Sequence, residues 1–190
     1  MTGIILLAAG ESKRLGRPKQ LVTLDGKPLL RRMAEVALQV APESPFVAVL
    51  GAVDEPCRLA LEGLEVSIVN NPDWQSGMGG SIAVGLASLP QGELTGVIVM
   101  LCDQPRVTSE HLQSVLSASS GKNIVATRCD GHLGPPAWFS SEMFPDLLLL
   151  SGTQQGAKAL IEKEPSIAWI DFPEAAFDID SPADLLKIKG

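Results

Sequence analysis

The sequence is poor in the residues that build disulfide frameworks and metal clusters. It has three cysteines and two histidines in 190 residues, and Cys57, Cys102 and Cys129 are widely spaced, with no CxxC pair. An odd number of isolated cysteines argues against a disulfide framework or a zinc site and favours a reducing compartment. We therefore expect a cytoplasmic protein.

Long apolar runs and an excess of basic residues are lacking as well. No run reaches the roughly 18–20 apolar residues that span a bilayer. The apolar stretch at residues 3–10 follows no basic segment, so we expect a buried strand there and not a signal peptide. The formal net charge of -7 disfavours broad nucleic-acid binding. We expect neither a membrane nor a nucleic acid as partner, but a small anionic ligand at one local basic site is compatible with this charge.

Short apolar runs alternate with longer amphipathic stretches. The pattern predicts strands at residues 4–9, 46–51, 66–69, 96–102, 123–127, 136–139 and 167–171. It predicts helices at 28–40, 54–62, 81–89, 140–150 and 154–163, a helix capped by Thr108 or Ser109, and a terminal helix that Ser181 caps and Pro182 begins. This alternation is typical of a three-layer, doubly wound, mostly parallel, Rossmann-like α/β sheet. With no internal repeat or linker, we expect one domain over residues 1–190.

Ligands bind outside the carboxyl ends of the strands in such sheets, which draws attention to the loops that begin at Gly10, Asn70 and Asp103. The first loop, LLAAGESKRLGRPKQL at residues 6–21, packs four cations into residues 13–19. It matches neither a Walker A loop nor a dinucleotide fingerprint in its glycine spacing. The glycine turn, with Arg14 and Lys19, can hold a polyphosphate. Charge alone is equally compatible with a solvated basic loop.

The other two loops also place polar residues at strand ends. In residues 70–86, glycines precede Ser81, which we expect to cap a helix whose N-terminus favours an anion. Trp74 in this stretch either stacks on a base or packs in the core. Asp103 follows a strand of uninterrupted apolar residues. A carboxylate there can meet a hard cation and a phosphate, or can simply cap the next turn.

The first loop has every fixed position of the pattern LAAGxSxRxGxPKxL. It thus resembles the signature of the nucleotidyltransferase family that includes the molybdenum cofactor cytidylyltransferases. NPDWQSGMGGSIAVGL resembles that family's NPxWxxGMxxSIxxGL segment, and DQP resembles its metal-binding motif. The resemblance implies a fold of the nucleotide-diphospho-sugar transferase type. It implies catalytic roles for Arg14, Lys19 and Asp103, with Asp103 as the first Mg²⁺ ligand. It places the nucleoside triphosphate against Leu7, Ala8, Ala9, Gly10, Ser12, Arg14, Lys19, Asn71, Gly77 and Ser81.

FDIDSPADL at residues 177–185 is similar to the DIDTPEDL segment near the end of relatives and supplies two more carboxylates. We expect Asp178 and Asp180 to point to opposite sides of an extended segment, so that only one faces Asp103. Asp180 is well placed to cap the terminal helix. Asp178 is therefore the preferred second metal ligand, with Asp180 as its substitute.

Residues 131–161 resemble the family's acceptor-side region. This implies that His132, Gly134 and Pro136 border the pocket for the second substrate, and Gln104 of the DQP motif is expected on the same acceptor side. A lone histidine such as His132 is more often a surface residue than a catalyst. Where relatives carry GDxGA this chain reads GTQQGA at 152–157, a departure that concerns the acceptor more than the nucleotide.

The resemblance implies transfer of CMP from CTP onto a phosphorylated acceptor, with Mg²⁺ as cofactor and pyrophosphate as product. The implied acceptor is a molybdopterin, which gives the cytosine dinucleotide form of the molybdenum cofactor. Two alternatives are a nucleotidyltransferase for a sugar or polyol phosphate, and a weakly catalytic chaperone that hands a cofactor to a molybdoenzyme. A nicotinamide dehydrogenase is disfavoured because GxGxxG is missing.

Overall fold

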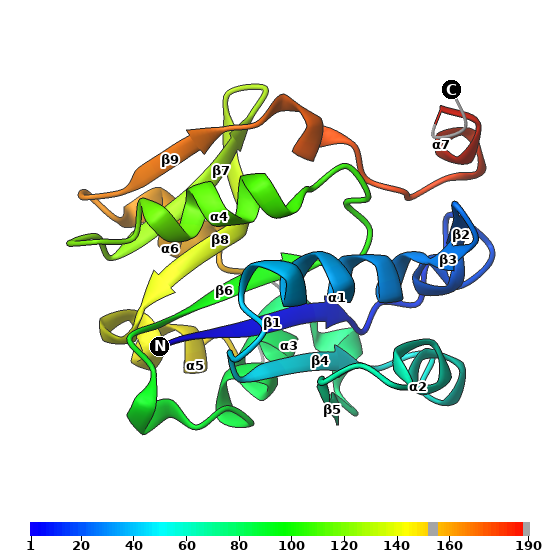
Figure 1. Ribbon diagram of the computed structural model, residues 1–190, viewed down its shortest axis with the longest axis horizontal. Coiled ribbons are helices and arrows are strands. Elements are labelled where there is room, and N and C mark those ends of the chain that lie inside the picture. Colours follow the sequence, from blue (N-terminus) through cyan, green and yellow to red (C-terminus); the bar gives the residue numbers. More distant parts are fainter. Residues whose placement is uncertain (152–155, 188–190) are drawn as a thin grey trace.

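A computed structural model describes residues 1–151 and 156–187. A seven-stranded sheet forms its middle layer, in the order β5-β4-β1-β6-β8-β7-β9 (Figure 1). Its strands are β1 (Thr2–Ala8), β4 (Phe46–Leu50), β5 (Ser67–Asn70), β6 (Gly96–Leu101), β7 (Ile124–Cys129), β8 (His132–Ser140) and β9 (Ala168–Asp171). Within this sheet, the two pairings of β8 are antiparallel and the other pairings of the described strands are parallel. The predicted mostly parallel, doubly wound α/β sheet is confirmed.

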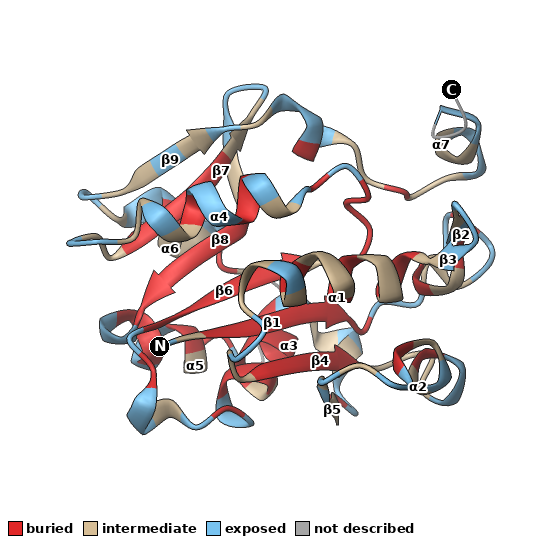
Figure 2. Ribbon diagram, in the orientation of Figure 1, coloured by how far each residue is buried: buried red, intermediate tan, exposed pale blue. Residues whose placement is uncertain are grey.

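Helices cover both faces of this sheet and give three layers. α1 (Leu29–Val40), α2 (Glu55–Leu61) and α4 (Ser109–Ser117) pack on one face, and α3 (Met78–Ala87), α5 (Phe144–Leu148) and α6 (Lys158–Lys163) pack on the other (Figure 1). Ile4 and Leu6 of β1 belong to the first core, whereas Ile5 and Leu7 belong to the second. Successive side chains of a strand point to opposite faces, so a strand of purely apolar residues is buried on both. Figure 2 shows the resulting buried centre.

Helix α3 begins at Met78 and not at Ser81, which changes the role of Ser81. Gly77, with φ at 117°, directly precedes the helix in a conformation that other residues rarely adopt. Ser81 lies inside the helix, is 3% exposed, and accepts a hydrogen bond from Nδ2 of Asn71 at 3.0 Å. The predicted cap at Ser81 was therefore wrong. The cap at Thr108 is confirmed, because its hydroxyl accepts a hydrogen bond from the N–H of His111.

The remaining differences follow from pairing and from proline. β8 begins at His132, ahead of the predicted residue 136, because it pairs with β7 in a hairpin that periodicity does not reveal. The helix expected over 140–150 is a 3-10 turn followed by α5. α6 begins at Lys158, and the expected start at 154 lies outside the described residues. Pro28 ends β3 (Lys27–Pro28), which pairs with β2 (Thr23–Leu24), and so precedes α1 instead of opening it.

The C-terminal segment returns to the edge where β1 and β6 end. The N–H of Ile179 donates to the carbonyl of Asp103 at 3.0 Å, and the fully buried Ile179 side chain packs with Leu15, Val22 and Leu29. The terminal helix α7 (Pro182–Lys187) consequently lies beside the β2–β3 hairpin (Figure 1). Across the described ranges, no helix is both long and apolar enough to cross a membrane.

Candidate active site

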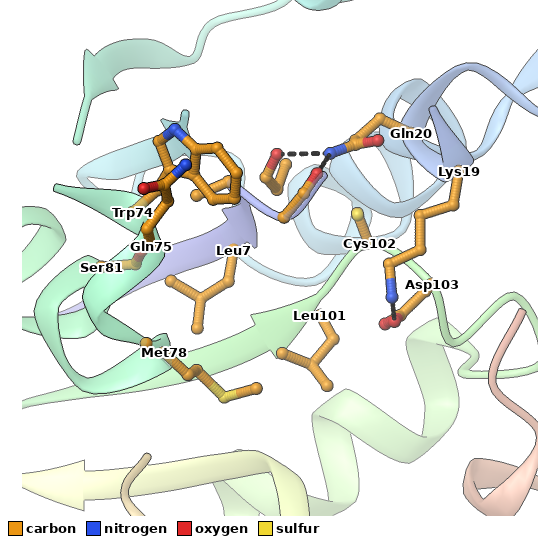
Figure 3. Close-up of a pocket in the computed structure, with 14 residues that line it drawn as sticks. Leu7, Lys19, Gln20, Trp74, Gln75, Met78, Ser81, Leu101, Cys102 and Asp103 are labelled. Atoms are coloured by element: carbon orange, nitrogen blue, oxygen red, sulfur yellow. Dashed lines mark hydrogen bonds and ion pairs between the residues drawn. The ribbon is translucent and has the colours of Figure 1, made fainter. Parts of the chain in front are cut away.

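A cavity of about 320 Å³ opens at the carboxyl edge of the sheet (Figure 3). Four segments form its walls: the end of β1 with the turn after it, the 3-10 helix Lys19–Leu21, the stretch from Trp74 into α3, and the end of β6. The structure thus brings the first three predicted motifs together. The predicted site residues among its lining are Leu7, Ala8, Ala9, Gly10, Lys19, Gly77, Ser81 and Asp103.

In the turn after β1, the carbonyl groups of residues 8–10 accept hydrogen bonds, whereas the N–H groups that follow have no acceptor among the described residues. The side-chain amide of Gln20 donates to the carbonyls of Ala8 and Gly10, at 2.8 and 2.7 Å. The carbonyl of Ala9 accepts from the N–H of Ala52 at 3.0 Å. Within the described part of the chain, no acceptor pairs with the backbone N–H groups of residues 9–14. Successive unpaired N–H groups in a turn form a receptor for anions.

Lys19 joins the first loop to two acids from distant segments. Its ammonium bonds Asp103, and its Nζ lies 3.1 Å from Oδ1 of Asp180. Burial opposes the charge on Lys19, but Asp103 and Asp180 outweigh burial and raise the pKa of the ammonium above its ordinary value. The Lys19 side chain is 18% exposed. It therefore stays charged at any physiological pH.

Arg14, the other predicted cation, is also held by Asp180. Its Nη2 lies 2.7 Å from Oδ2 of that carboxylate, and its side chain is 76% exposed. The Asp180 carboxylate is thus shared between Arg14 and Lys19. The predicted role of Asp180 as the cap of α7 was therefore wrong. Ser181 directly precedes α7, which begins at Pro182 as predicted. It donates its hydroxyl and its N–H to the carboxylate of Asp184, and the N–H bond is one half of a capping box.

Asp178 and Asp180 lie on the same side of the extended segment, so the expectation that they point to opposite sides was wrong. Residues two apart on an extended segment share a side, and the buried Ile179 between them takes the other. Burial, with the nearby charges of Asp103 and Asp180, raises the pKa of Asp178 to about 6. Oδ1 of Asp103 and Oδ1 of Asp178 are buried without a hydrogen-bond partner. This corner of the site thus holds more negative charge than Lys19 and Arg14 balance.

The arrangement bears on whether a divalent ion fits. In the described ranges, no three His, Cys, Asp or Glu residues are grouped so that they could enclose a metal. Mg²⁺, however, is commonly bound by one or two carboxylates, with water and substrate phosphates as the remaining ligands. Asp103 and Asp180 already converge on one cation, the ammonium of Lys19. A two-carboxylate site therefore fits the residues present.

The opposite wall of the cavity is neutral. Trp74 lines the cavity there, on the side away from Lys19 and Asp103 (Figure 3). Asn71 is 2% exposed and supports this wall from behind, since it donates to Ser81 and accepts from the N–H of Asp73. Gly51 lets the wall close: a β-carbon there would lie 2.7 Å from the carbonyl oxygen of Ala9 and 2.8 Å from Cβ of Trp74.

Two important positions carried no signal in the motifs. Gln20 occupies a variable position of the first signature, and Gly51 looks like any glycine after a strand. The side chain of Gln20 holds the turn, and the bare Cα of Gly51 makes room for Ala9 and Trp74. Only contacts between segments far apart in the sequence show these roles. Ser12 was predicted, and its hydroxyl accepts a hydrogen bond from the N–H of Lys19 at 3.0 Å.

The predicted acceptor-side residues are only partly brought together. Gly134 lines a second cavity of about 240 Å³, which adjoins the first because both are lined by Met78 and Leu101. His132 is exposed at the start of β8. The carbonyl of Pro136 accepts from the hydroxyl of Thr127 at 2.7 Å. Gln104 is 5% exposed and donates to the carbonyl of Ala175, which ties it to the C-terminal segment.

Comparison with known proteins agrees with this geometry. The chain is 27% identical over 169 residues to the purine catabolism protein PucB of Bacillus subtilis, covering 83% of this chain and 79% of that protein. It is 27% identical over 198 residues to a probable molybdenum cofactor guanylyltransferase of Pelotomaculum thermopropionicum, covering 99% of this chain and 91% of that protein. The crystal structure of Rv0371c from Mycobacterium tuberculosis superimposes with a TM-score of 0.82, at 28% identity and 100% coverage of both chains. A second structure of that protein, complexed with manganese, gives a TM-score of 0.77 at 27% identity, covering 98% of this chain and 96% of that one.

The model of one family matches residues 4–167, a range that includes the loop after β1, the stretch into α3 and Asp103. The cavity, its donor-rich turn and its lysine-bridged acids lie at the sheet edge formed by these segments. The chain therefore belongs to the family of MobA-like NTP transferase domains.

Proposed function

We propose that this nucleotidyltransferase moves CMP from CTP onto the phosphate of a molybdopterin-type acceptor in the cytoplasm and releases pyrophosphate. The observation that carries the proposal is the joint lining of one cavity by the donor-rich turn and the Lys19–Asp103 pair. A triphosphate needs the first and a reacting α-phosphate needs the second. The three cysteines are free thiols, in keeping with a reducing compartment.

The chain's own residues act mainly by binding and orienting. The N–H groups of residues 9–14 donate hydrogen bonds to phosphate oxygens. Arg14 and Lys19 exchange Asp180 for the triphosphate and stabilise charge on the leaving pyrophosphate. An acceptor phosphate is already an anion, so no strong general base is needed. Catalysis then consists of alignment and of charge stabilisation on preorganised groups.

Mg²⁺ is the proposed cofactor, with Asp103 as its first protein ligand. The contacts favour Asp180 over Asp178 as the second, because Oδ1 of Asp180 already shares a cation with Asp103, whereas Oδ1 of Asp178 is sealed from solvent. When bound, the ion would neutralise charge on the α-phosphate and the acceptor. The manganese complex of Rv0371c shows that a relative of the same fold takes up a divalent ion.

The second cavity, where the acceptor is proposed to bind, is lined mainly by apolar side chains. Among the described residues that line it, Lys158 alone is charged, and the others are apolar side chains or glycine. A sugar or polyol would leave hydroxyl groups buried there without partners, at a cost of about 1–3 kcal/mol each. The amino, carbonyl and ring N–H groups of a pterin would carry the same cost if they were buried there. The pterin acceptor is therefore proposed from the resemblance of the sequence motifs and not from this lining.

Calorimetry with CTP, GTP, ATP and UTP in the presence of Mg²⁺ tests the nucleotide. We expect the tightest binding for CTP, whereas a preference for GTP would move the chain to the activity named for its Pelotomaculum relative. Pyrophosphate release with CTP and a panel of acceptors tests the reaction. Release with molybdopterin and not with sugar phosphates is the expected result. Tight CTP binding without release from any acceptor would instead favour a chaperone for a molybdoenzyme.

A further inference from the structure

Gln20 is a polar side chain with no exposed surface. A buried amide is costly unless its groups find partners. Here both Nε2 hydrogens are used, toward the carbonyls of Ala8 and Gly10, and Oε1 accepts from the hydroxyl of Ser12 at 3.4 Å. The two carbonyl acceptors fix the orientation of the amide, because only its NH₂ end can donate to them. Figure 3 shows Gln20 among the residues that line the cavity, with its amide nitrogen directed to a carbonyl of the turn.

These bonds decide which polarity the turn offers to a ligand. A backbone turn carries as many acceptors as donors, and free carbonyl oxygens would repel phosphate. Gln20 occupies the carbonyls of Ala8 and Gly10, and Ala52 occupies the carbonyl of Ala9. The N–H groups of residues 9–14 find no acceptor in the described chain. The net effect is that the carbonyls of residues 8–10 are withheld from a ligand, while the N–H groups of residues 9–14 stay available to donate.

Gln20 also fixes the first loop at both of its ends. Ala8 ends β1, and Ser12 follows the turn with φ at 60°. The hydroxyl of Ser12 accepts from the N–H of Lys19, which places the residue whose ammonium bridges Asp103 and Asp180. One buried amide thus connects the strand end, the turn and the start of the 3-10 helix. Its loss would let the turn and Lys19 move independently.

We infer that Gln20 is a positioning residue of the nucleotide site: it withholds the carbonyls of Ala8 and Gly10, so that the turn after β1 offers N–H donors to the ligand, and it sets the position of Lys19 relative to them. It acts through the backbone and does not touch the ligand. The inference rests on the proposed function, in that a nucleoside triphosphate must be the ligand of this loop. Nothing in the signature marks the position, and the contacts alone assign the role.

The test uses two variants of the full chain, with CTP and Mg²⁺ as the probe in calorimetry. Gln20→Glu keeps the shape but faces two carbonyls with a group that cannot donate when ionised, and Gln20→Met removes both donors. Losing the partners of buried carbonyls should weaken CTP binding about 10- to 100-fold at pH 8. A protonated glutamate can donate one bond, so the Gln20→Glu variant should regain part of its affinity, relative to the parent, as the pH falls to 6.

Gln91→Glu is the matched control, because Gln91 also donates to a backbone carbonyl, that of Leu86, but lies away from the cavity. It should bind CTP like the parent. A merely structural role for Gln20 would lower the melting temperature but leave the affinity of the folded variant within threefold of the parent, with no recovery at pH 6, and that result would overturn the inference. Should Gln20→Glu fail to fold, Gln20→Met decides by the same affinity criterion. If the parent itself binds no nucleoside triphosphate, the proposed function fails first.

Discussion

Asp180 holds Arg14 and Lys19, two of the four cations of the first loop, which would make it a competitor of the triphosphate in the proposed reaction. Its carboxylate lies 2.7 Å from Arg14 and 3.1 Å from Lys19. Asp180→Asn keeps the shape and removes the charge. In the absence of divalent ions, the variant should bind CTP more tightly than the parent, because the two cations no longer have to leave an acid.

The size of this gain follows from exposure. Arg14 is 76% exposed, so its pair with Asp180 contributes only about 0.2–1 kcal/mol. Lys19 is 18% exposed, and its hydrogen bond to the same carboxylate contributes more, on the order of 1 kcal/mol. A total of about 1–2 kcal/mol corresponds to about 5- to 30-fold tighter binding. Calorimetry in EDTA measures it directly.

With Mg²⁺ present, we expect Asp180→Asn to impair the enzyme instead of improving its CTP binding. If Asp180 shares the ion with Asp103, its loss should lower turnover about 100-fold, the scale of one preorganised charge contact. Asp178→Asn should change turnover less. Asp171→Asn serves as control, since Asp171 pairs with Arg128 on the surface, away from the cavity. A variant at Asp180 with unchanged affinity in EDTA and unchanged turnover in Mg²⁺ would refute both roles.

Three further outcomes are expected. Lys19→Ala should lower turnover about 10²- to 10³-fold in a pyrophosphate-release assay, by loss of one charge contact. Burial lowers the pKa of His111 from 6.5 to about 4, so the neutral ring contributes stability that is complete above pH 6.5 and lost as the pH falls toward 4. This amounts to about 3 kcal/mol, measured by urea unfolding at pH 7.5 and 4.5. Gly51→Ala would place a methyl carbon 2.8 Å from Cβ of Trp74. We expect it to lower the free energy of unfolding in urea at pH 7.5 by about 1–3 kcal/mol. Gly92→Ala is the control, because a β-carbon there meets no atom within 4 Å.

Each of these outcomes has a clear contrary result. Near-normal turnover of Lys19→Ala would remove Lys19 from the chemistry. If the parent and His111→Gln lose the same free energy of unfolding between pH 7.5 and pH 4.5, the loss belongs to groups other than His111. Glu174 is among these groups, since its charge raises the pKa that burial lowers. Equal stability of Gly51→Ala and Gly92→Ala would show that the wall behind Ala9 yields to a methyl group.

Local pattern was enough for much of the fold. The uninterrupted apolar character of β1, β4 and β6 predicted strands buried on both faces, and helices between them predicted crossovers to parallel neighbours. Boundaries were less secure where partners decide them. Gly77 and not Ser81 sets the start of α3, and pairing with β7 extends β8 to His132.

The sequence by itself determined which loops form the site, because residues that end neighbouring parallel strands must meet at one edge, and the signature after β1 names the ligand class. Only the tertiary structure decided how the charges pair. Asp180 pairs with Arg14 and Lys19, and Gln20 donates hydrogen bonds to the carbonyls of the turn. These contacts join residues that are distant in the chain or lie outside regular elements, so hydrophobic periodicity does not predict them. Burial then sets the strength of these ion pairs, since the same pair is weak on the surface and strong where water is excluded.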